Sequence, residues 1–591
     1  MKIAALVSAL ALSAHAANAV STYSAKVLID NATSLCTLIT PTGEAQQHRA
    51  IQKDSDVVEY IRNRQNRLPE EVLVGEEEGL QQFVEIVGGS ALAVDQRILE
   101  RCKNGLRTNP DLVQEKTLLR TNAAPEATAI TRKLVDSGNP LNRIDVVFMG
   151  DGYTSAEQDK FFQDMQRLTD DMFGGETFAQ YLPLFNIWAA YLPSVQSGIG
   201  TGGSPRNTAF QLYRDGTELR GVYTANPSAA RSVCTGMGTG ACDFPSIIGN
   251  DDFYGGLGGE FVISTSSKTS GTIVLRHEMG HNFGDVGEEY DGGQVYRGAN
   301  AASSISAVSW KHWLTEPSKL VEQQMVQLYQ KHIWYDLKQG AYTISFTSTG
   351  TYKRWFLQFS VSGTDTDDSL TVTLDGKPLA WKSNGLKDRS FYQWRSETSG
   401  FTKGTHTLVV KAGGPFDSAI IKQLCNAVIY EYMDEATMKL DDPDYIGIYP
   451  TWDINKRKTY RPDNERCLMR NMSSPVFCRV CQENMWQKFL ARIEFIDDVV
   501  VSNRVATLKL IPLAQLRTKN DTFPTLNPEV AKQEKYSVTW LKSGSELTQF
   551  RDAFSANLTA GTYTVRVTFS TPNVRNDPKK YMQSEKTFTV V

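Results

Sequence analysis

The sequence lacks any apolar run long enough to cross a bilayer. The N-terminal run at residues 3–12 is well short of the ~20 residues that a membrane-spanning helix needs. The chain also lacks a strong excess of either charge, because its formal net charge is −4, so neither nucleic acid nor an anionic membrane is expected as a partner. It has no internal repeat and no low-complexity tract. These absences predict an ordinary globular protein of several domains.

The first residues have the pattern of a secretory signal peptide. Lys2 comes before the apolar run, and Ala17-Asn18-Ala19 offers a cleavage site. A second site at residues 14–16 would move the mature start by a few residues. We therefore predict a signal peptide over residues 1–19 and a soluble, secreted, extracellular glycoprotein. Four N-x-S/T sequons fit this prediction: Asn31, Asn471, Asn520 and Asn557.

The chain has only eight cysteines, and export would place them in an oxidising compartment that favours disulfides. Cys234 and Cys242 bracket a short glycine-rich loop and are expected to pair. The second group consists of Cys425, Cys467, Cys478 and Cys481. Its C-x-x-C spacing would also suit a structural zinc site, but the compartment argument favours disulfides.

The segment at residues 274–284 contains His277-Glu278-x-x-His281. Residues i and i+4 share one face of a helix, so both imidazoles can reach a single cation. Zn²⁺ binds imidazole nitrogen, and at a catalytic site it lowers the pKa of its bound water to about 7. Glu278 is placed to act as general base on that water and then as general acid. The sequence therefore predicts a zinc hydrolase of the metallopeptidase type.

Several blocks of sequence extend this motif. They are IDVVFMGDGYTSAE at 144–157, FNIWAAYLPS at 185–194, HEMGHNFGDVGEEY at 277–290, and the segments 467–470 and 477–481. With these blocks the chain resembles the IgA-peptidase family of secreted zinc metallopeptidases. The resemblance implies a metzincin-like catalytic domain, one bound zinc and endopeptidase activity on a protein or glycoprotein substrate. It does not carry over immunoglobulin A as the substrate.

The third zinc ligand is less certain because the sequence departs from the metzincin pattern. Metzincins place a histidine or aspartate ten residues after the first ligand, but that position is Gly287. The chain must turn back after the helix, and Gly284 and Gly287 supply a permissive backbone. The family pattern suggests Glu289 as the ligand, with Glu288 as runner-up and His312 as a distant third. A water molecule completing the site is the remaining alternative.

Met469 follows Cys467 in a C-x-M segment, and metzincins have such a methionine turn beneath the zinc before a final helix. Met469 is therefore expected under the metal, although it could also be an ordinary core methionine. Its placement requires residues 421–497 to rejoin the catalytic domain after an insertion.

The expected fold is multidomain: an α/β metzincin-like zinc peptidase domain with an inserted β-sandwich and a C-terminal immunoglobulin-like β-sandwich. The predicted segments are a signal peptide at 1–19, a mixed or β-rich domain at 20–125, the catalytic domain at 126–320 and 421–497, the inserted sandwich at 325–420 and the C-terminal sandwich at 498–591. Within the first domain, residues 54–64 are expected to be helical.

The inserted sandwich suggests a competing function. Its aromatic residues are Trp355, Trp381, Tyr392 and Trp394. Such rings can stack on sugars, so carbohydrate is a candidate partner, although core packing is the commoner role for aromatic rings. The alternative function is an adhesion or carbohydrate-binding protein with a vestigial peptidase domain. The presence of Glu278, which a decayed enzyme would not need, favours the peptidase.

Overall fold

The computed structural model describes residues 22–30, 36–45, 56–62, 81–102, 106–108 and 129–591, with gaps at 239, 294, 320, 322–323, 417–419, 441, 443 and 518–531. The predicted signal peptide and the sequons at Asn31 and Asn520 lie outside these residues. The chain forms two compact units, one comprising residues 1–61 and 80–121, the other residues 62–79 and 122–591.

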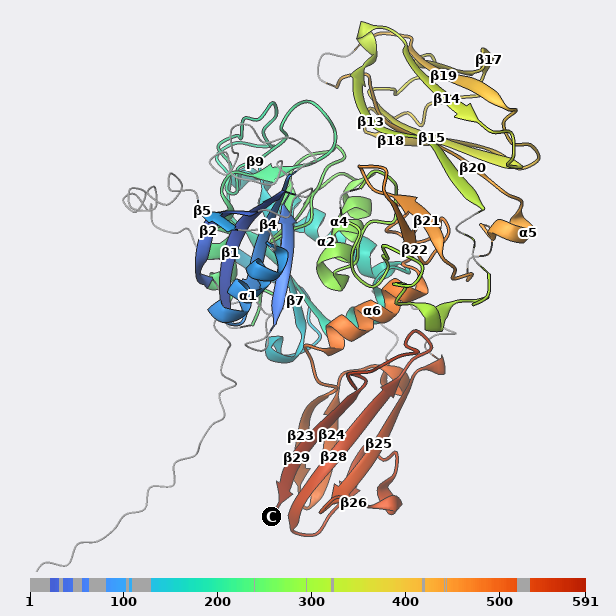
Figure 1. The fold of residues 1–591 in the computed structure, drawn as a ribbon. Coiled ribbons are helices and arrows are strands. Elements are labelled where there is room, and N and C mark those ends of the chain that lie inside the picture. Colours follow the sequence, from blue (N-terminus) through green and yellow to red (C-terminus); the bar gives the residue numbers. More distant parts are fainter. Residues whose placement is uncertain are drawn as a thin grey trace, which may run out of the picture. The chain divides into compact units, whose positions relative to one another are not determined.

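The first unit is a five-stranded sheet with one helix (Figure 1). Its strands, in the order β3-β4-β1-β2-β5, are β1 Thr22–Asp30, β2 Cys36–Ala45, β3 Val57–Arg62, β4 Gln81–Gly88 and β5 Leu106–Thr108. A disulfide joins Cys36 in β2 to Cys102 at the end of helix α1, Ala91–Arg101. The helix expected at 54–64 is wrong, because β-branched Val57 and Val58 begin a strand there.

The second unit contains a mixed sheet in the order β12-β11-β7-β8-β6. Its strands are β6 Ile130–Val135, β7 Ile144–Asp151, β8 Phe185–Tyr191, β11 Phe244–Gly249 and β12 Val262–Thr265. Only β6 runs antiparallel to its neighbour in this sheet. Every residue of β7 is buried, which explains its nearly continuous apolar sequence.

Three helices pack with this sheet: α2 Gln158–Gly174, α4 Gly271–Gly284 and α6 Arg479–Leu490 (Figure 1). A shorter helix, α3 Pro227–Gly236, and the pair β9 Leu212–Tyr213 and β10 Tyr223–Thr224 lie between β8 and β11 in the chain. The ring of Phe283 in α4 contacts the rings of Phe178, Phe185, Phe244 and Phe489. This aromatic core holds α4 between the sheet and α6.

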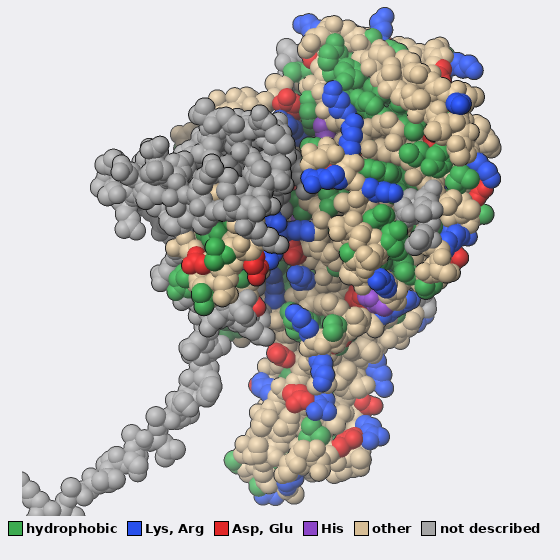
Figure 2. Space-filling view, viewed as in Figure 1, with side chains coloured by type: hydrophobic (Ala, Val, Ile, Leu, Met, Phe, Trp, Pro, Cys, Tyr) green, Lys and Arg blue, Asp and Glu red, His purple; other side chains and the backbone are tan. Residues whose placement is uncertain are grey.

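The inserted β-sandwich has two four-stranded sheets, β13-β20-β15-β18 and β14-β19-β16-β17. The strands are β13 Met325–Asp336, β14 Tyr342–Ser348, β15 Arg354–Ser362, β16 Leu370–Leu374, β17 Lys377–Pro378, β18 Ser390–Ser396, β19 Gly404–Ala412 and β20 Gln423–Tyr432. Because β20 pairs with both β13 and β15, the sandwich extends beyond residue 420. On the face shown in Figure 2, basic side chains are dispersed among apolar and acidic ones.

The chain then returns through α5 Glu435–Met438, β21 Tyr449–Trp452 and β22 Lys458–Arg461 before α6. The C-terminal sandwich follows, with sheets β23-β24-β27 and β26-β25-β28-β29. Its strands are β23 Ile496–Ser502, β24 Val505–Leu510, β25 Lys535–Lys542, β26 Ser545–Glu546, β27 Ser555–Asn557, β28 Gly561–Ser570 and β29 Gln583–Val590.

The fold is therefore multidomain and mostly β-sheet, with few helices. Alternation of buried and partly exposed residues in β28 is typical of a sheet with one face on a core. No helix in the described part of the chain is long and apolar enough to cross a membrane.

Candidate metal centre

Helix α4 carries the two motif histidines and is buried along most of its length. Gly280 allows close packing, since a Cβ there would lie 2.8 Å from both Met469 Sδ and Phe477 Cε1. The helix ends at Asp285, which takes the left-handed conformation with φ of 50° and donates its backbone N–H to His281 O at 2.9 Å. This left-handed cap turns the chain about one helical turn after the second histidine.

This turn brings a carboxylate to the two imidazoles. Glu288 Oε2 lies 3.1 Å from His277 Nε2, and Glu288 Oε1 lies 3.2 Å from His281 Nε2. The three side chains present one ligand atom each within 4.8 Å of one another. His277 is 2% exposed and Glu288 is 9% exposed, so the group is largely shielded from solvent. Two imidazoles and one carboxylate form a ligand set typical of catalytic zinc sites.

The other nitrogen of each imidazole is held by a backbone carbonyl. His277 Nδ1 lies 3.3 Å from Leu468 O, and His281 Nδ1 lies 2.8 Å from Val286 O. A carbonyl can only accept, so each Nδ1 carries a proton, and Nε2, which faces Glu288, is the nitrogen that a metal would bind. Metal-binding histidines are commonly fixed in this way, which sets the tautomer and the ring orientation.

The surroundings in the site strongly shift the pKa values of Glu288 and His281. Burial raises the pKa of Glu288, but the charges of His281 and His277 more than offset this, and its pKa falls far below the usual range. Burial lowers the pKa of His281, but the charge and hydrogen bond of Glu288, the charge of Glu278 and the Val286 carbonyl together raise it to about 9. Perturbed ionisable groups of this kind concentrate at functional sites.

Glu278 sits beside the histidines under a glycine loop. A Cβ at Gly258 would lie 3.0 Å from Glu278 Oε2, so the loop can approach this closely only because residue 258 is glycine. Asn282 Nδ2 donates to Gly259 O at 2.9 Å and holds the loop against α4. Burial raises the pKa of Glu278. A carboxyl group with a raised pKa is suited to accepting and returning a proton near neutral pH.

Met469 lies beneath this part of α4. It is fully buried and packs against Gly280, the residue before His281. Its backbone carbonyl accepts a hydrogen bond from Glu289 N at 3.0 Å. The segment 467–469 therefore contacts both α4 and the loop after it, which carries the two glutamates.

Sequence reasoning missed Tyr290. Its hydroxyl donates to Glu288 Oε1 at 3.0 Å, and its ring lies 6.0 Å from the His277 ring. The tyrosine directly after the acidic pair was visible in the sequence, but nothing there indicated that it turns back onto Glu288. Tyr290 fixes the orientation of the carboxylate.

The structure does not bring Glu289 to the histidines, in contrast to the sequence prediction. Glu289 Oε1 accepts from Asn300 Nδ2 at 2.9 Å and lies 3.6 Å from Cys481 Sγ. Glu288 and Glu289 are adjacent in the loop after α4, yet their carboxylates lie in two different groups of ligand atoms. His312 is also elsewhere, with Nε2 2.5 Å from Glu483 Oε2.

The cysteines divide differently from the prediction. Cys234 and Cys242 form the expected disulfide. The disulfides expected for the second group are wrong, because its members are buried free thiols: Cys425, Cys467, Cys478 and Cys481. The physical reason is that Cys425 lies apart in β20, while the other three surround the carboxylate of Glu289.

No curated protein matches the chain. Among solved structures, a family 35 carbohydrate-binding module from Clostridium thermocellum is 10% identical, with 18% of this chain and 90% of that chain covered and a TM-score of 0.12. The CBM35 from Paenibacillus barcinonensis is 9% identical, with coverage of 18% and 94% and a TM-score of 0.12.

The family model described as IgA Peptidase M64 matches residues 132–320. The match contains β7, β8 and all of α4, with the three grouped residues His277, His281 and Glu288. Residues 132–320 of the chain are therefore similar to the IgA peptidase M64 family.

Proposed function

We propose that the protein is a secreted zinc metalloendopeptidase with a metzincin-like catalytic domain, in which His277, His281 and Glu288 bind the metal. The observation that carries this proposal is the convergence of two Nε2 atoms and one carboxylate, with Glu278 beside them. Glu288 replaces Glu289 as the third ligand. The family match supports peptidase activity on a protein substrate.

The residues fit Zn²⁺ on chemical grounds. Both histidines direct Nε2 at one point, and this nitrogen would give up its proton to a bound metal while Nδ1 keeps its contact with a backbone carbonyl. Three protein ligands leave a position for water, which distinguishes a catalytic from a structural zinc site. Bound zinc would supply Lewis-acid polarisation of the scissile carbonyl and a water of lowered pKa.

The protein's own residues would carry the proton. Glu278 takes a proton from the attacking water and returns it to the leaving amine nitrogen, so it ends the cycle in its starting state. Its raised pKa favours both halves of this transfer. Gly258 and Gly259 would border the substrate on the side of Glu278. Met469 would serve as the methionine turn that supports α4 from below.

Secretion is part of the proposal and draws its support from the cysteines. Cys36–Cys102 and Cys234–Cys242 are disulfides, which form and persist in oxidising compartments. The N-terminal signal pattern agrees with this. Asn557 is exposed and would be open to glycosylation if the host glycosylates its secreted proteins.

The test is proteolysis of a mixture of extracellular proteins by the purified full chain, with new termini mapped by mass spectrometry. We expect internal cleavages that disappear with a chelator and return with added zinc. The Glu278→Gln variant should bind zinc as the wild type does and cleave at least about 10²-fold more slowly. Proteolysis that survives both the chelator and Glu278→Gln would contradict the proposal.

The aromatic residues of the inserted sandwich serve mainly its own core. Trp355 stacks on Phe401 with ring centroids 5.2 Å apart, and Trp394 lies 5.1 Å from Phe359. Trp394 Nε1 is also bound to Ala380 O at 2.8 Å. These contacts favour the core role over a sugar-stacking platform, so we do not propose carbohydrate binding as a second function.

A further inference from the structure

A second group of ligand atoms lies next to the first. Glu289, Cys467, Cys478 and Cys481 are all buried and present one ligand atom each within 4.8 Å of one another. Cys478 is the N-cap of α6 and Cys481 lies in its first turn, whereas Glu289 follows α4. Segments far apart in the chain therefore converge on one point.

The spacing of these atoms fits tetrahedral coordination. Cys467 Sγ lies 3.9 Å from Cys481 Sγ, and Cys481 Sγ lies 3.6 Å from Glu289 Oε1. With Zn–S near 2.3 Å and Zn–O near 2.0–2.2 Å, a tetrahedron has S···S edges of about 3.8 Å and S···O edges of about 3.5 Å. A disulfide would need about 2.05 Å, so Cys467 and Cys481 are not bonded to each other.

The carboxylate supplies an independent observation. Glu289 is 0% exposed, and its Oε2 has no hydrogen-bond partner among the described residues. A buried carboxylate oxygen left without a partner is costly, and such groups normally pair or coordinate a metal. A cation among the three sulfurs would satisfy it.

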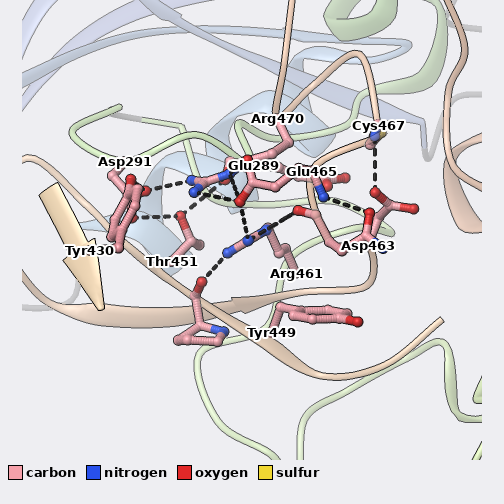
Figure 3. Close-up of polar contacts among 12 residues, drawn as sticks. Glu289, Asp291, Tyr430, Tyr449, Thr451, Arg461, Asp463, Glu465, Cys467 and Arg470 are labelled. Atoms are coloured by element: carbon pink, nitrogen blue, oxygen red, sulfur yellow. Dashed lines mark hydrogen bonds and ion pairs between the residues drawn. The ribbon is translucent and has the colours of Figure 1, made fainter. Parts of the chain in front are cut away.

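The surroundings suit thiolates. Cys478 N donates to Cys467 Sγ at 3.3 Å, and the N-terminus of α6 favours negative charge on the sulfurs of its first turn. Figure 3 shows the guanidinium groups of Arg461 and Arg470 in the same buried network as Glu289, and Asp463 bound to Cys467 N at 2.9 Å. The two arginines offset part of the negative charge of the ligand set.

We propose that Glu289, Cys467, Cys478 and Cys481 bind a second, structural zinc ion. Three soft sulfurs and one oxygen in tetrahedral array favour Zn²⁺, and four protein ligands leave no position open for catalysis. The proposal does not depend on the peptidase activity. The second zinc would fix Glu289 beside Glu288, and Cys467 beside Leu468, whose carbonyl binds His277.

The experiment measures zinc per chain by mass spectrometry of the full protein purified under reducing conditions. We expect two zinc ions in the wild type, one in the His277→Ala/His281→Ala double variant, and one fewer than wild type in Cys481→Ser. Cys425→Ser is the matched control, since Cys425 is an equally buried free thiol outside the group, and it should keep both ions. Unchanged zinc content in Cys481→Ser would overturn the proposal.

A second measurement guards against misfolding of Cys481→Ser. The His277→Ala/His281→Ala variant is reconstituted with Co²⁺ and examined for thiolate-to-cobalt charge-transfer absorption, which imidazole and carboxylate ligands do not give. The presence of this absorption band supports the proposed thiolate site, and its absence overturns the proposal. If instead the catalytic assignment fails, the histidine changes leave the zinc content unaltered while the cobalt band remains, so the two failures are distinguishable.

Discussion

At the scale of single residues, the orientation of Glu288 decides what the site can bind. We expect Glu288→Ala to lower zinc affinity and proteolysis by more than the 10- to 100-fold typical of outer partners, because a ligand itself is lost. Zinc affinity is measured by competition with a chelator. Asp285→Asn is the control from the same loop, since Asp285 is 45% exposed and lies outside the ligand group, and it should retain both properties. Equal affinity in the two variants would exclude Glu288 as a ligand.

In the proposed site, Tyr290 would act on the metal through Glu288. Tyr290→Phe removes only the hydroxyl that donates to Glu288 Oε1. We expect zinc affinity to fall by about 10- to 100-fold, as for other outer partners of metal ligands, with the fold retained. Chelator competition and circular dichroism together check this. Wild-type affinity in Tyr290→Phe would show that the hydroxyl does not position the ligand.

Sequence alone predicts part of this centre. His277, Glu278 and His281 follow from helical spacing, which fixes their relative positions without knowledge of the rest of the fold. The choice between Glu288 and Glu289 does not, because it depends on a hydrogen bond from Glu289 N to Met469 O, far along the chain. The side chains of neighbouring residues in a loop point in different directions, and no local sequence signal indicates which of the two glutamates faces the histidines.

At the scale of elements, the inserted sandwich touches the start of the zinc-motif helix. Asp388, just before β18, accepts from Ser270 Oγ at 2.8 Å and from Tyr254 N at 2.6 Å. Ser270 is the N-cap of α4. Asp388→Ala removes the acceptor of the Tyr254 N–H and leaves the Ser270 hydroxyl with only Ser267 Oγ, so we expect a loss of about 1–3 kcal/mol in unfolding free energy. Urea denaturation checks it, with the partly exposed Asp365→Ala as control. No difference between the two variants would contradict this link.

His332 in β13 makes the stability of the inserted sandwich depend on pH. Burial, together with the charges of Arg389 and Arg220, lowers its pKa from 6.5 to about 4, and its Nε2 faces Gly292 O. Below pH 6.5, His332 takes up a proton in the unfolded chain, whereas in the folded chain it stays neutral until the pH nears 4. The free energy of unfolding therefore decreases as the pH falls from 6.5 toward 4. A shift of this size corresponds to about 3 kcal/mol.

The measurement is the free energy of unfolding in urea between pH 7 and pH 4, in the wild type and in His332→Gln. We expect the variant to lose less stability than the wild type over this range, because its side chain does not titrate. Parallel curves for the two proteins would contradict the assignment to His332.

Several strands could be predicted from the sequence, whereas the helix predicted at 54–64 was wrong. The apolar run at 144–151 and the alternation at 561–567 indicate strands directly, because each reflects how many faces of the strand are buried. Residues 54–64 have charged side chains at helical spacing, but Val57 and Val58 favour the strand that pairing with β4 completes. Tertiary pairing overrides a weak local pattern there.

At the scale of the whole molecule, the C-terminal sandwich shares its core with the catalytic part. Phe569 in β28 lies 5.3 Å from Trp486 in α6 and 5.5 Å from Phe495, as ring-centroid distances. We expect Phe569→Ala to cost about 3–5 kcal/mol and to loosen α6. Thermal unfolding and zinc content are measured together. Phe588→Ala, a less buried ring in the same sheet, is the comparison and should cost less. Equal losses would contradict a shared core.

Because Glu288 and Glu289 lie in two different groups of ligand atoms, the number of residues in the turn after α4 is constrained. Deleting one residue between Asp285 and Glu288 would bring Glu289 to the histidines and Tyr290 to the cysteines, and adding one would bring Glu288 to the cysteines and leave the histidines without a carboxylate. A substitution in the same turn would leave both in register. Homologous sequences should therefore contain no insertions or deletions across this turn and should keep glycine at position 287, where a Cβ would lie 2.6 Å from the backbone of Arg297.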